Sequence, residues 1–159
     1  QVMATYAYDD AHLTQNVPGL VVVNGQSPKA AMAGDRLPGS TKNSGSLQAI
    51  YTYPLGDGRD VQAVWGSTYT GDIYSRVGLQ GYGTDIPAYW NSRASLTYRT
   101  PKYDIGLFAD NIFDVYAVTS VSNNLSSLDR SRTGVTERYY AQSVLTPRQF
   151  GIQLHYRYN

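Results

Sequence analysis

The chain contains no cysteine, which excludes a disulfide framework and a thiolate metal site. Charged residues make up only 16% of its 159 residues, against roughly 25% in soluble domains. The net charge of +1 gives no reason to expect a nucleic-acid partner. The longest apolar run, Leu20–Val23, falls far short of the ~20 residues that a membrane helix requires. The lack of cysteine excludes a disulfide scaffold, and the lack of a long apolar run excludes a helical membrane span.

Residues that carry catalysis are also scarce. The two histidines, His12 and His155, lie far apart in the sequence, and His155 falls among the polar residues of a strand-like pattern. Neither a serine elbow nor a phosphate-binding loop is present. Asp9 and Asp10 fit a strand end better than a calcium loop, which needs more oxygen ligands. We therefore expect no enzyme, no metal site and no cofactor.

Tyrosine is the residue that the chain has in excess, with 15 copies against 3 Phe and 2 Trp. A tyrosine has an apolar ring and a polar tip, so it suits surfaces that are partly apolar and partly wet. Antibody-like loops, sugar-binding modules and outer-membrane barrels all need such surfaces. The tyrosine content narrows the function to these classes without choosing among them.

Alternation of apolar and polar residues, the period of a β-strand, is the dominant pattern. In residues 47–55, for example, Leu47, Ala49 and Tyr51 share one face, and Gln48 lies on the other. The same pattern recurs and predicts about six strands, at residues 1–8, 44–53, 60–70, 88–98, 103–113 and 147–158. Several are long enough for the ~9–11 residues that cross a bilayer at a tilt. No convincing helix is found.

The connections between these strands alternate strictly between short and long. Residues 54–59 and 99–102 form tight turns, whereas residues 9–43, 71–87 and 114–146 are long links. A barrel with short periplasmic turns and long outer loops produces this order. With the C-terminus on the periplasmic side, both tight turns also lie on the periplasmic side, and all three long links lie on the external side. Long links without structure also argue against a compact soluble domain.

The pattern therefore predicts an all-β, antiparallel transmembrane β-barrel wall, with its apolar face toward lipid and its polar face toward a wet lumen. A soluble β-sandwich is disfavoured, because its core prefers Val, Ile and Leu over Tyr. Six strands cannot close a wide barrel, so we expect the chain to be part of a longer protein, with a strand already in progress at Gln1. The alternative is a small self-closed barrel with further strands near Leu20–Val23 and Tyr139–Leu145.

Three segments resemble those of a known family. Gln149–Tyr156 looks like the outer-membrane assembly signal, a polar residue and a glycine followed by spaced hydrophobic residues. Asn111–Tyr116 resembles the Asn-Leu-Phe-Asp-x-x-Tyr segment on the penultimate strand of TonB-dependent receptors. Gly34–Pro38 is similar to their loop-to-strand transition. These segments occur in family order, although the chain ends in Tyr158-Asn159 where many members end in Phe.

The resemblance implies that residues 1–159 are the C-terminal part of a barrel of about 22 strands, whose plug domain and earlier strands are not in this sequence. It also implies active uptake of a scarce ligand, such as an iron–siderophore complex, with cobalamin or an oligosaccharide as other cargoes. The expected location is the outer membrane of a Gram-negative bacterium. The expected partners are lipid, lipopolysaccharide, the rest of the barrel, the plug and the TonB complex. The alternatives are a passive porin or adhesin-type barrel and a soluble sugar-binding β-sandwich.

Two groups of residues are candidates for function. Candidate ligand contacts are the basic and aromatic residues of the predicted outer loops, although such charges can also be solvated or meet lipopolysaccharide phosphates. They are Arg76, Tyr82, Arg130, Arg132, Tyr139 and Tyr140. The candidate assembly signal consists of Gln149, Gly151, Leu154, Tyr156 and Tyr158.

Overall fold

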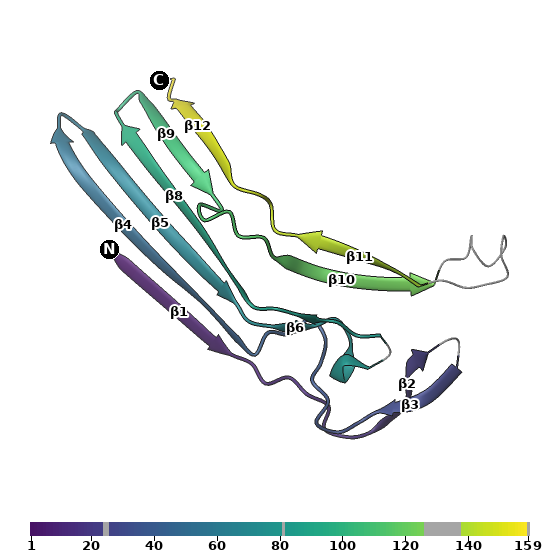
Figure 1. Ribbon diagram of the computed structural model, residues 1–159. Coiled ribbons are helices and arrows are strands. Elements are labelled where there is room, and N and C mark those ends of the chain that lie inside the picture. The colour runs from purple at the N-terminus through teal and green to yellow at the C-terminus, as the bar shows by residue number, and fades with distance from the viewer. Residues whose placement is uncertain (24–25, 81, 126–137, 159) are drawn as a thin grey trace, which may run out of the picture.

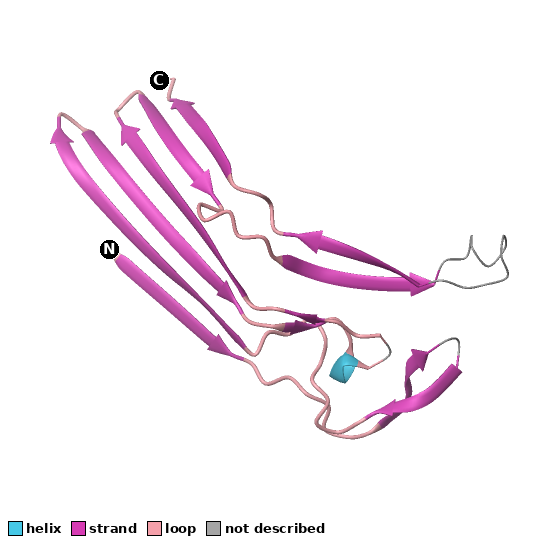
Figure 2. Cartoon of the chain, viewed as in Figure 1, coloured by secondary structure: helices cyan, strands magenta, loops and turns pink. Residues whose placement is uncertain are grey.

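The computed structural model describes residues 1–23, 26–80, 82–125 and 138–158. Within these residues the chain consists of β-strands joined by loops, with one short 3-10 helix, η1 (Val77–Leu79). Figure 2 shows a long, curved sheet at one end of the molecule and smaller hairpins at the other. The predicted all-β class is confirmed.

Six strands form the main sheet, and they lie side by side in the order in which they occur in the chain (Figure 1). All five pairings are antiparallel. In sheet order the strands are β1 (Val2–Tyr8), β4 (Asn43–Gly56), β5 (Arg59–Thr70), β8 (Tyr89–Arg99), β9 (Tyr103–Asp110) and β12 (Gln149–Tyr156). The six predicted strands are confirmed, and β1 and β12 are the two edges of an unclosed sheet.

One strand is shorter than predicted. β9 was expected to run to residue 113, but it stops at Asp110. Asn111 adopts a left-handed backbone with φ of 48°. Its side-chain amide donates to the carbonyl of Val115 at 3.0 Å and accepts from the Val115 N–H at 2.9 Å. These local bonds compete with the sheet ladder and end the strand.

The two tight turns lie at the same end of the sheet, as predicted (Figure 1). Between β4 and β5, Asp57 and Gly58 have φ of 54° and 71°, the left-handed pair that a two-residue hairpin needs. Between β8 and β9, the hydroxyl of Thr100 accepts from the N–H of Tyr103 and donates to its carbonyl. We call this the tight-turn end, and the opposite end the long-loop end.

The long links contain strands that the sequence pattern did not place. Each link carries one antiparallel hairpin: β2 (Val17–Val23) with β3 (Gln26–Ala31), β6 (Ile73–Tyr74) with β7 (Asp85–Ile86), and β10 (Val118–Leu125) with β11 (Arg138–Val144). The expectation of structureless links was therefore wrong. Strands do cover residues 20–23 and 139–144, but they form separate two-stranded sheets and do not close a small barrel.

The register aligns most of the apolar residues of the six strands on one face, whereas Ile50, Val64 and Phe108 lie in one row on the other. One row across the sheet contains Tyr51, Ala63, Leu96, Leu107 and Ile152. Leu96 is 50% exposed and Ile152 is 76% exposed. Among the described residues, the buried apolar side chains are Ala31, Ile86 and Ala117, all outside the main sheet. The sheet therefore has no core of its own, and its apolar face needs an apolar partner.

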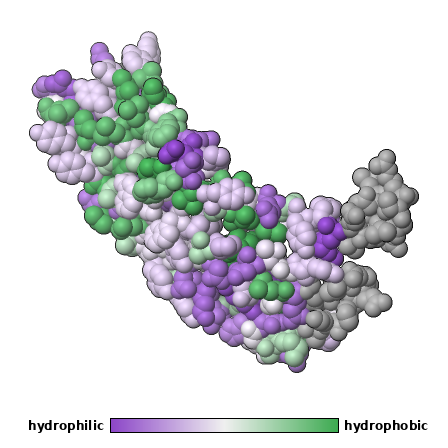
Figure 3. Space-filling model, in the orientation of Figure 1, coloured by the Kyte–Doolittle hydropathy of each residue, from purple (hydrophilic) through white to green (hydrophobic). Residues whose placement is uncertain are grey.

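Polar residues occupy much of the opposite face. Gln48, Gly66, Arg93, Asp110 and Gln149 form one row across five strands. A second row contains Thr52, Gln62, Thr97, Gly106 and Gln153. In Figure 3 apolar residues gather toward the tight-turn end, and hydrophilic ones become frequent toward the long loops. One face of the sheet is therefore mainly apolar, and the other carries these two polar rows.

Aromatic residues mark both ends of the apolar face. Tyr98 and Tyr103 are in ring contact near the tight-turn end, with centroids 6.4 Å apart. Tyr69 and Trp90 are in contact toward the long-loop end, with centroids 5.0 Å apart. From Tyr98 to Trp90 along β8 is about 26 Å at ~3.3 Å per residue, or about 20 Å across at a tilt of ~40°. That spacing is close to the ~25 Å apolar band of outer-membrane barrels.

The glycine of the assembly signal has a structural reason. Gly151 on β12 lies directly opposite Phe108 on β9, whose ring covers the space where a Cβ would stand. Gly151→Ala is therefore expected to destabilise the protein by about 1–3 kcal/mol, the usual cost of overpacking. In a protein that already carries Phe108→Ala, the ring is gone, so Gly151→Ala should be tolerated. Urea unfolding of the two single variants and the double variant, as a double-mutant cycle, measures this coupling.

Gly66 is the matched control. It lies on the same face, but a Cβ there would come no closer than 3.9 Å to any of its three nearest atoms. Gly66→Ala should leave the unfolding midpoint nearly unchanged. Equal losses for Gly66→Ala and Gly151→Ala would contradict the packing explanation.

Candidate functional site

The three long links are bonded to one another. We call residues 9–42 loop A, residues 71–88 loop B and residues 111–148 loop C. The N–H of Gly39 in loop A donates to the carbonyl of Tyr74 in loop B at 3.0 Å. Strand β7 of loop B contacts strand β10 of loop C. The long-loop end is therefore a connected structure rather than three independent excursions.

Arg36 fastens loop A to loop B. Its guanidinium pairs with the carboxylate of Asp72 and donates to the carbonyl of Ser40 at 2.9 Å. It also lies over the ring of Tyr74, 4.8 Å from the centroid, and its side chain is only 16% exposed. Next to it, the carboxylate of Asp35 accepts hydrogen bonds from the Met32 N–H and the side chain of Gln80. The segment 34–38, which resembles a loop-to-strand transition of TonB-dependent receptors in sequence, thus bonds loop A to loop B.

Loops B and C meet at a cluster of two arginines. Asn123 on β10 accepts hydrogen bonds at its Oδ1 from Arg76 of loop B at 3.2 Å and from Arg138 on β11 at 2.6 Å. Its Nδ2 donates to the carbonyl of Tyr82 at 3.1 Å. The guanidinium of Arg138 lies over the Tyr82 ring, 4.1 Å from the centroid. We call these four residues, Arg76, Tyr82, Asn123 and Arg138, the arginine cluster.

The structure brings some predicted ligand contacts together and separates others. Arg76 and Tyr82 both belong to the arginine cluster. Tyr140 lies directly opposite Asn123 in the β10–β11 hairpin, so it shares that face, whereas its neighbour Tyr139 lies on the other face. Both tyrosines are about half exposed. Arg130 and Arg132 lie outside the described residues.

Two members of the cluster, Asn123 and Arg138, were not among the predicted site residues. Arg138 directly precedes Tyr139 and Tyr140, and this basic and aromatic run was the feature of the sequence that could have identified it as a site residue. Asn123 gives no signal in sequence, because its role depends on the register of a hairpin whose strands are joined by a long connection.

Lys42 shows how another surface cation of this end is compensated. It is the last residue of loop A, directly before β4, with its Nζ 3.4 Å from the carboxylate of Asp10. A hydrogen bond with Tyr8, followed by the negative charge of Asp10, raises the pKa of Lys42 above its ordinary value. The carboxylate of Asp10 is thus engaged by a lysine, which agrees with reading Asp9 and Asp10 as a strand end.

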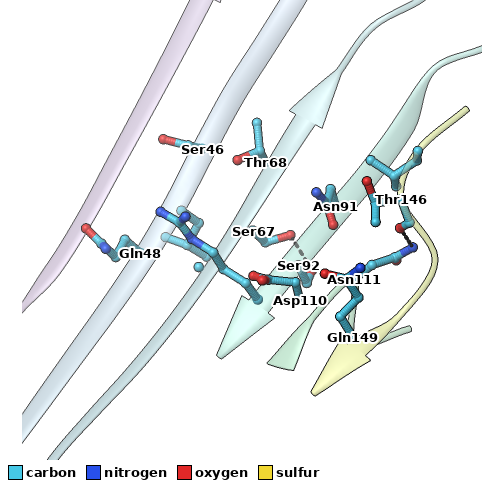
Figure 4. A pocket seen from close by; sticks show the side chains of 14 residues that line it. Ser46, Gln48, Ser67, Thr68, Asn91, Ser92, Asp110, Asn111, Thr146 and Gln149 are labelled. Atoms are coloured by element: carbon cyan, nitrogen blue, oxygen red, sulfur yellow. Dashed lines mark hydrogen bonds between the residues drawn. The ribbon is translucent and has the colours of Figure 1, made fainter. Parts of the chain in front are cut away.

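The polar face of the sheet contains a second candidate region, a hollow of about 540 Å³. Figure 4 shows polar side chains gathered there from β4, β5, β8 and β9 and from the chain before β12. The Arg93 side chain lies beside Gly66 on the neighbouring strand. The Oδ1 of Asn91 is buried without a hydrogen-bond partner in the structure. This lining suits contact with water or with a polar partner.

The residues of the assembly signal lie on or beside the edge strand β12. Leu154, Tyr156 and Tyr158 are 70%, 65% and 91% exposed, respectively. Gln149 pairs with Asp110, and Gly151 packs under Phe108. Their role in barrel assembly remains a prediction.

Two features are absent from the residues that the structure describes. No helix among them is both long and apolar enough to cross a bilayer. Nor do three or more His, Asp or Glu side chains gather where they could hold a metal ion, as far as the structure describes the chain.

Comparison with known proteins gives a likeness in fold. No family model matches the sequence, and no curated protein matches it. The chain is similar to a solved structure, the ferric-catecholate import receptor Fiu from E. coli K12 in its closed form, with a TM-score of 0.60 and 23% sequence identity. The match covers 97% of this chain and 18% of that one. The predicted resemblance to an outer-membrane receptor barrel is thus confirmed at the level of the fold, and the chain spans about a fifth of that receptor.

Proposed function

We propose that this chain forms part of the wall of a TonB-dependent outer-membrane receptor that imports a small ligand. The observation that carries the proposal is the exposed apolar face, which runs in register across six strands and ends in aromatic residues. Hydrocarbon is the partner that this face fits, because the backbone groups inside the sheet are already paired. Sorting of the turns and loops to opposite ends fits the two sides of an outer membrane.

The proposal extends to the rest of the assembly, because an open sheet needs further strands to close a barrel. Residues 1–159 would be the C-terminal part of the barrel, with further strands beside β1 and β12. The polar face, including the hollow around Arg93, would look into the lumen toward a plug domain. The TonB complex would act through that plug. The tight-turn end would face the periplasm, and the loops would face lipopolysaccharide and the medium in a Gram-negative bacterium.

The proposed activity is binding and uptake rather than catalysis. Loops A, B and C are bonded to one another, and the partly exposed Arg76 and Arg138 lie beside Tyr82 where loops B and C meet. Such a surface suits a compact ligand with negative charge. Because the similar solved structure is a ferric-catecholate import receptor, we propose an iron chelate as the cargo.

Growth under iron limitation tests the proposal. The gene for the full-length protein would be deleted, and strains with and without it would be grown on a panel of ferric chelates as the sole iron source. We expect loss of growth on at least one chelate, restoration by the gene, and the protein in the outer-membrane fraction in a heat-modifiable form. Recovery of the protein from the soluble fraction, or uptake that survives loss of TonB, would contradict the proposal.

A further inference from the structure

Among the described residues, no carboxylate pairs with either of the two arginines of the cluster. Five of the eight arginines that the structure describes pair with an aspartate: Arg36, Arg59, Arg99, Arg148 and Arg157. Of the three without such a partner among the described residues, Arg93 lies on the polar face of the sheet, and the other two are Arg76 and Arg138. They converge instead on one neutral oxygen, the Oδ1 of Asn123, at 3.2 and 2.6 Å. Two cations held this close repel each other, so an anion beside them would be strongly favoured.

The two guanidinium groups are held in place before any ligand arrives. Arg138 stacks on the Tyr82 ring at 4.1 Å, and Asn123 is itself anchored by its bond to the carbonyl of Tyr82. Tyr82 has a left-handed backbone with φ of 67°, a costly conformation for a bulky residue. Each guanidinium carries five N–H donors, and Asn123 accepts a hydrogen bond from one group on each arginine. The remaining donors suit an oxygen-rich anion, which guanidinium groups bind with two parallel hydrogen bonds.

We infer that Arg76 and Arg138, positioned by Asn123, form a binding site for clustered anionic oxygens. The inference rests on the proposed function, and it specifies that the ligand is selected by its negative charge. Two sources supply this chemistry at the long-loop end: an anionic iron chelate arriving from the medium, and the phosphates of lipopolysaccharide. The site joins loop B to loop C, so its occupant would also hold these two loops together.

The decisive variant is Asn123→Asp, which keeps the size of the side chain and replaces the neutral oxygen with a carboxylate. The new charge would pair with both arginines and lower the net charge of the cluster from +2 to +1, at the loss of the hydrogen bond to the Tyr82 carbonyl. Arg76→Gln and Arg138→Gln remove the charges one at a time. Arg59→Gln is the matched control, because Arg59 is an exposed, hydrogen-bonded arginine at the opposite end of the sheet.

The measurement is binding of two ferric chelates to the full-length protein in detergent, by quenching of tryptophan fluorescence. One probe is the trianionic tris-catecholato iron(III) complex, and the other is the neutral tris-acetohydroxamato iron(III) complex. For the catecholate complex we expect Asn123→Asp to lose about tenfold or more in affinity, since hydrogen bonds to charged groups have effects of this size. The neutral complex and Arg59→Gln should show no change.

Other results would separate the outcomes. If the three cluster variants bind both the trianion and lipopolysaccharide as the unaltered protein does, the inference is wrong, and the proposed uptake function is unaffected. An equal loss of both chelates in Asn123→Asp would also overturn it, because the cluster would then have only a structural role. If the protein binds lipopolysaccharide in proteoliposomes and the variants lose that binding instead, the anion is the lipid phosphate. Binding of neither anion by the unaltered protein overturns the inference, whereas the growth assay tests uptake independently.

Discussion

Replacing Leu96 by arginine is expected to prevent the protein from assembling in the outer membrane. Leu96 lies on β8, a central strand, on the apolar face and between the two aromatic ends, nearer to Tyr98 than to Trp90. An arginine on the lipid face near the bilayer midplane costs about 2–4 kcal/mol, a large fraction of the stability of an ordinary domain. The amount of folded protein in the membrane fraction, measured by heat-modifiable migration on a gel, reports the effect.

Gln62→Arg is the matched control for this prediction. Gln62 lies on the neighbouring strand β5 at a similar depth, but on the polar face beside Thr52 and Thr97. An arginine there would enter the lumen and remain in contact with water, so we expect nearly normal assembly. If the two variants assembled equally well, the apolar face would not be the lipid face.

A second large effect is expected when residues 1–159 are produced alone. The six-stranded sheet leaves unpaired N–H and C=O groups along the outer edges of β1 and β12. Water can satisfy these groups, but hydrocarbon cannot, at a cost of several kcal/mol for each group. Exposed strand edges also pair with other copies of the chain. We therefore expect aggregation or failure to insert, measured by size-exclusion chromatography in detergent and by flotation with liposomes.

The full-length protein, refolded under the same conditions, is the positive control. A monodisperse, heat-resistant monomer of residues 1–159 in detergent would show that the sheet can close on itself. The edges of β1 and β12 would then have to meet, contrary to the open sheet of the structure.

The main sheet was predictable from sequence because its pattern is local. Alternation along each strand identifies the strand and its faces, and two short turns fix the pairing of β4 with β5 and of β8 with β9. The end of β9 was missed for a different reason. Asn111 continues the strand in sequence, but its side chain bonds to the backbone of Val115, and local alternation does not report such a bond.

The loops were less predictable because their contacts join distant residues. Arg36 and Asp72 are 36 positions apart, and Arg76 and Asn123 are 47 apart. Basic and aromatic composition was enough to select Arg76 and Tyr82. It could not identify Asn123, whose place depends on the register of the β10–β11 hairpin. It also placed Tyr139 and Tyr140 in one group, although the hairpin turns them to opposite faces.

The measurement that tests the proposed membrane wall most directly is spin labelling along β8, from Tyr89 to Arg99. The 159 residues contain no cysteine, so single cysteines can be introduced in the full-length protein once any others are replaced. Oxygen, which concentrates in lipid, and a water-soluble nickel chelate then report the surroundings of each label. We predict that the two accessibilities oscillate with a period of two residues and in opposite phase. Oxygen should peak at Trp90, Ala94, Leu96 and Tyr98, and nickel at Asn91, Arg93, Ser95 and Thr97. Accessibilities that rise and fall together, or nickel maxima on the apolar face, would contradict a β-sheet wall between lipid and a wet lumen.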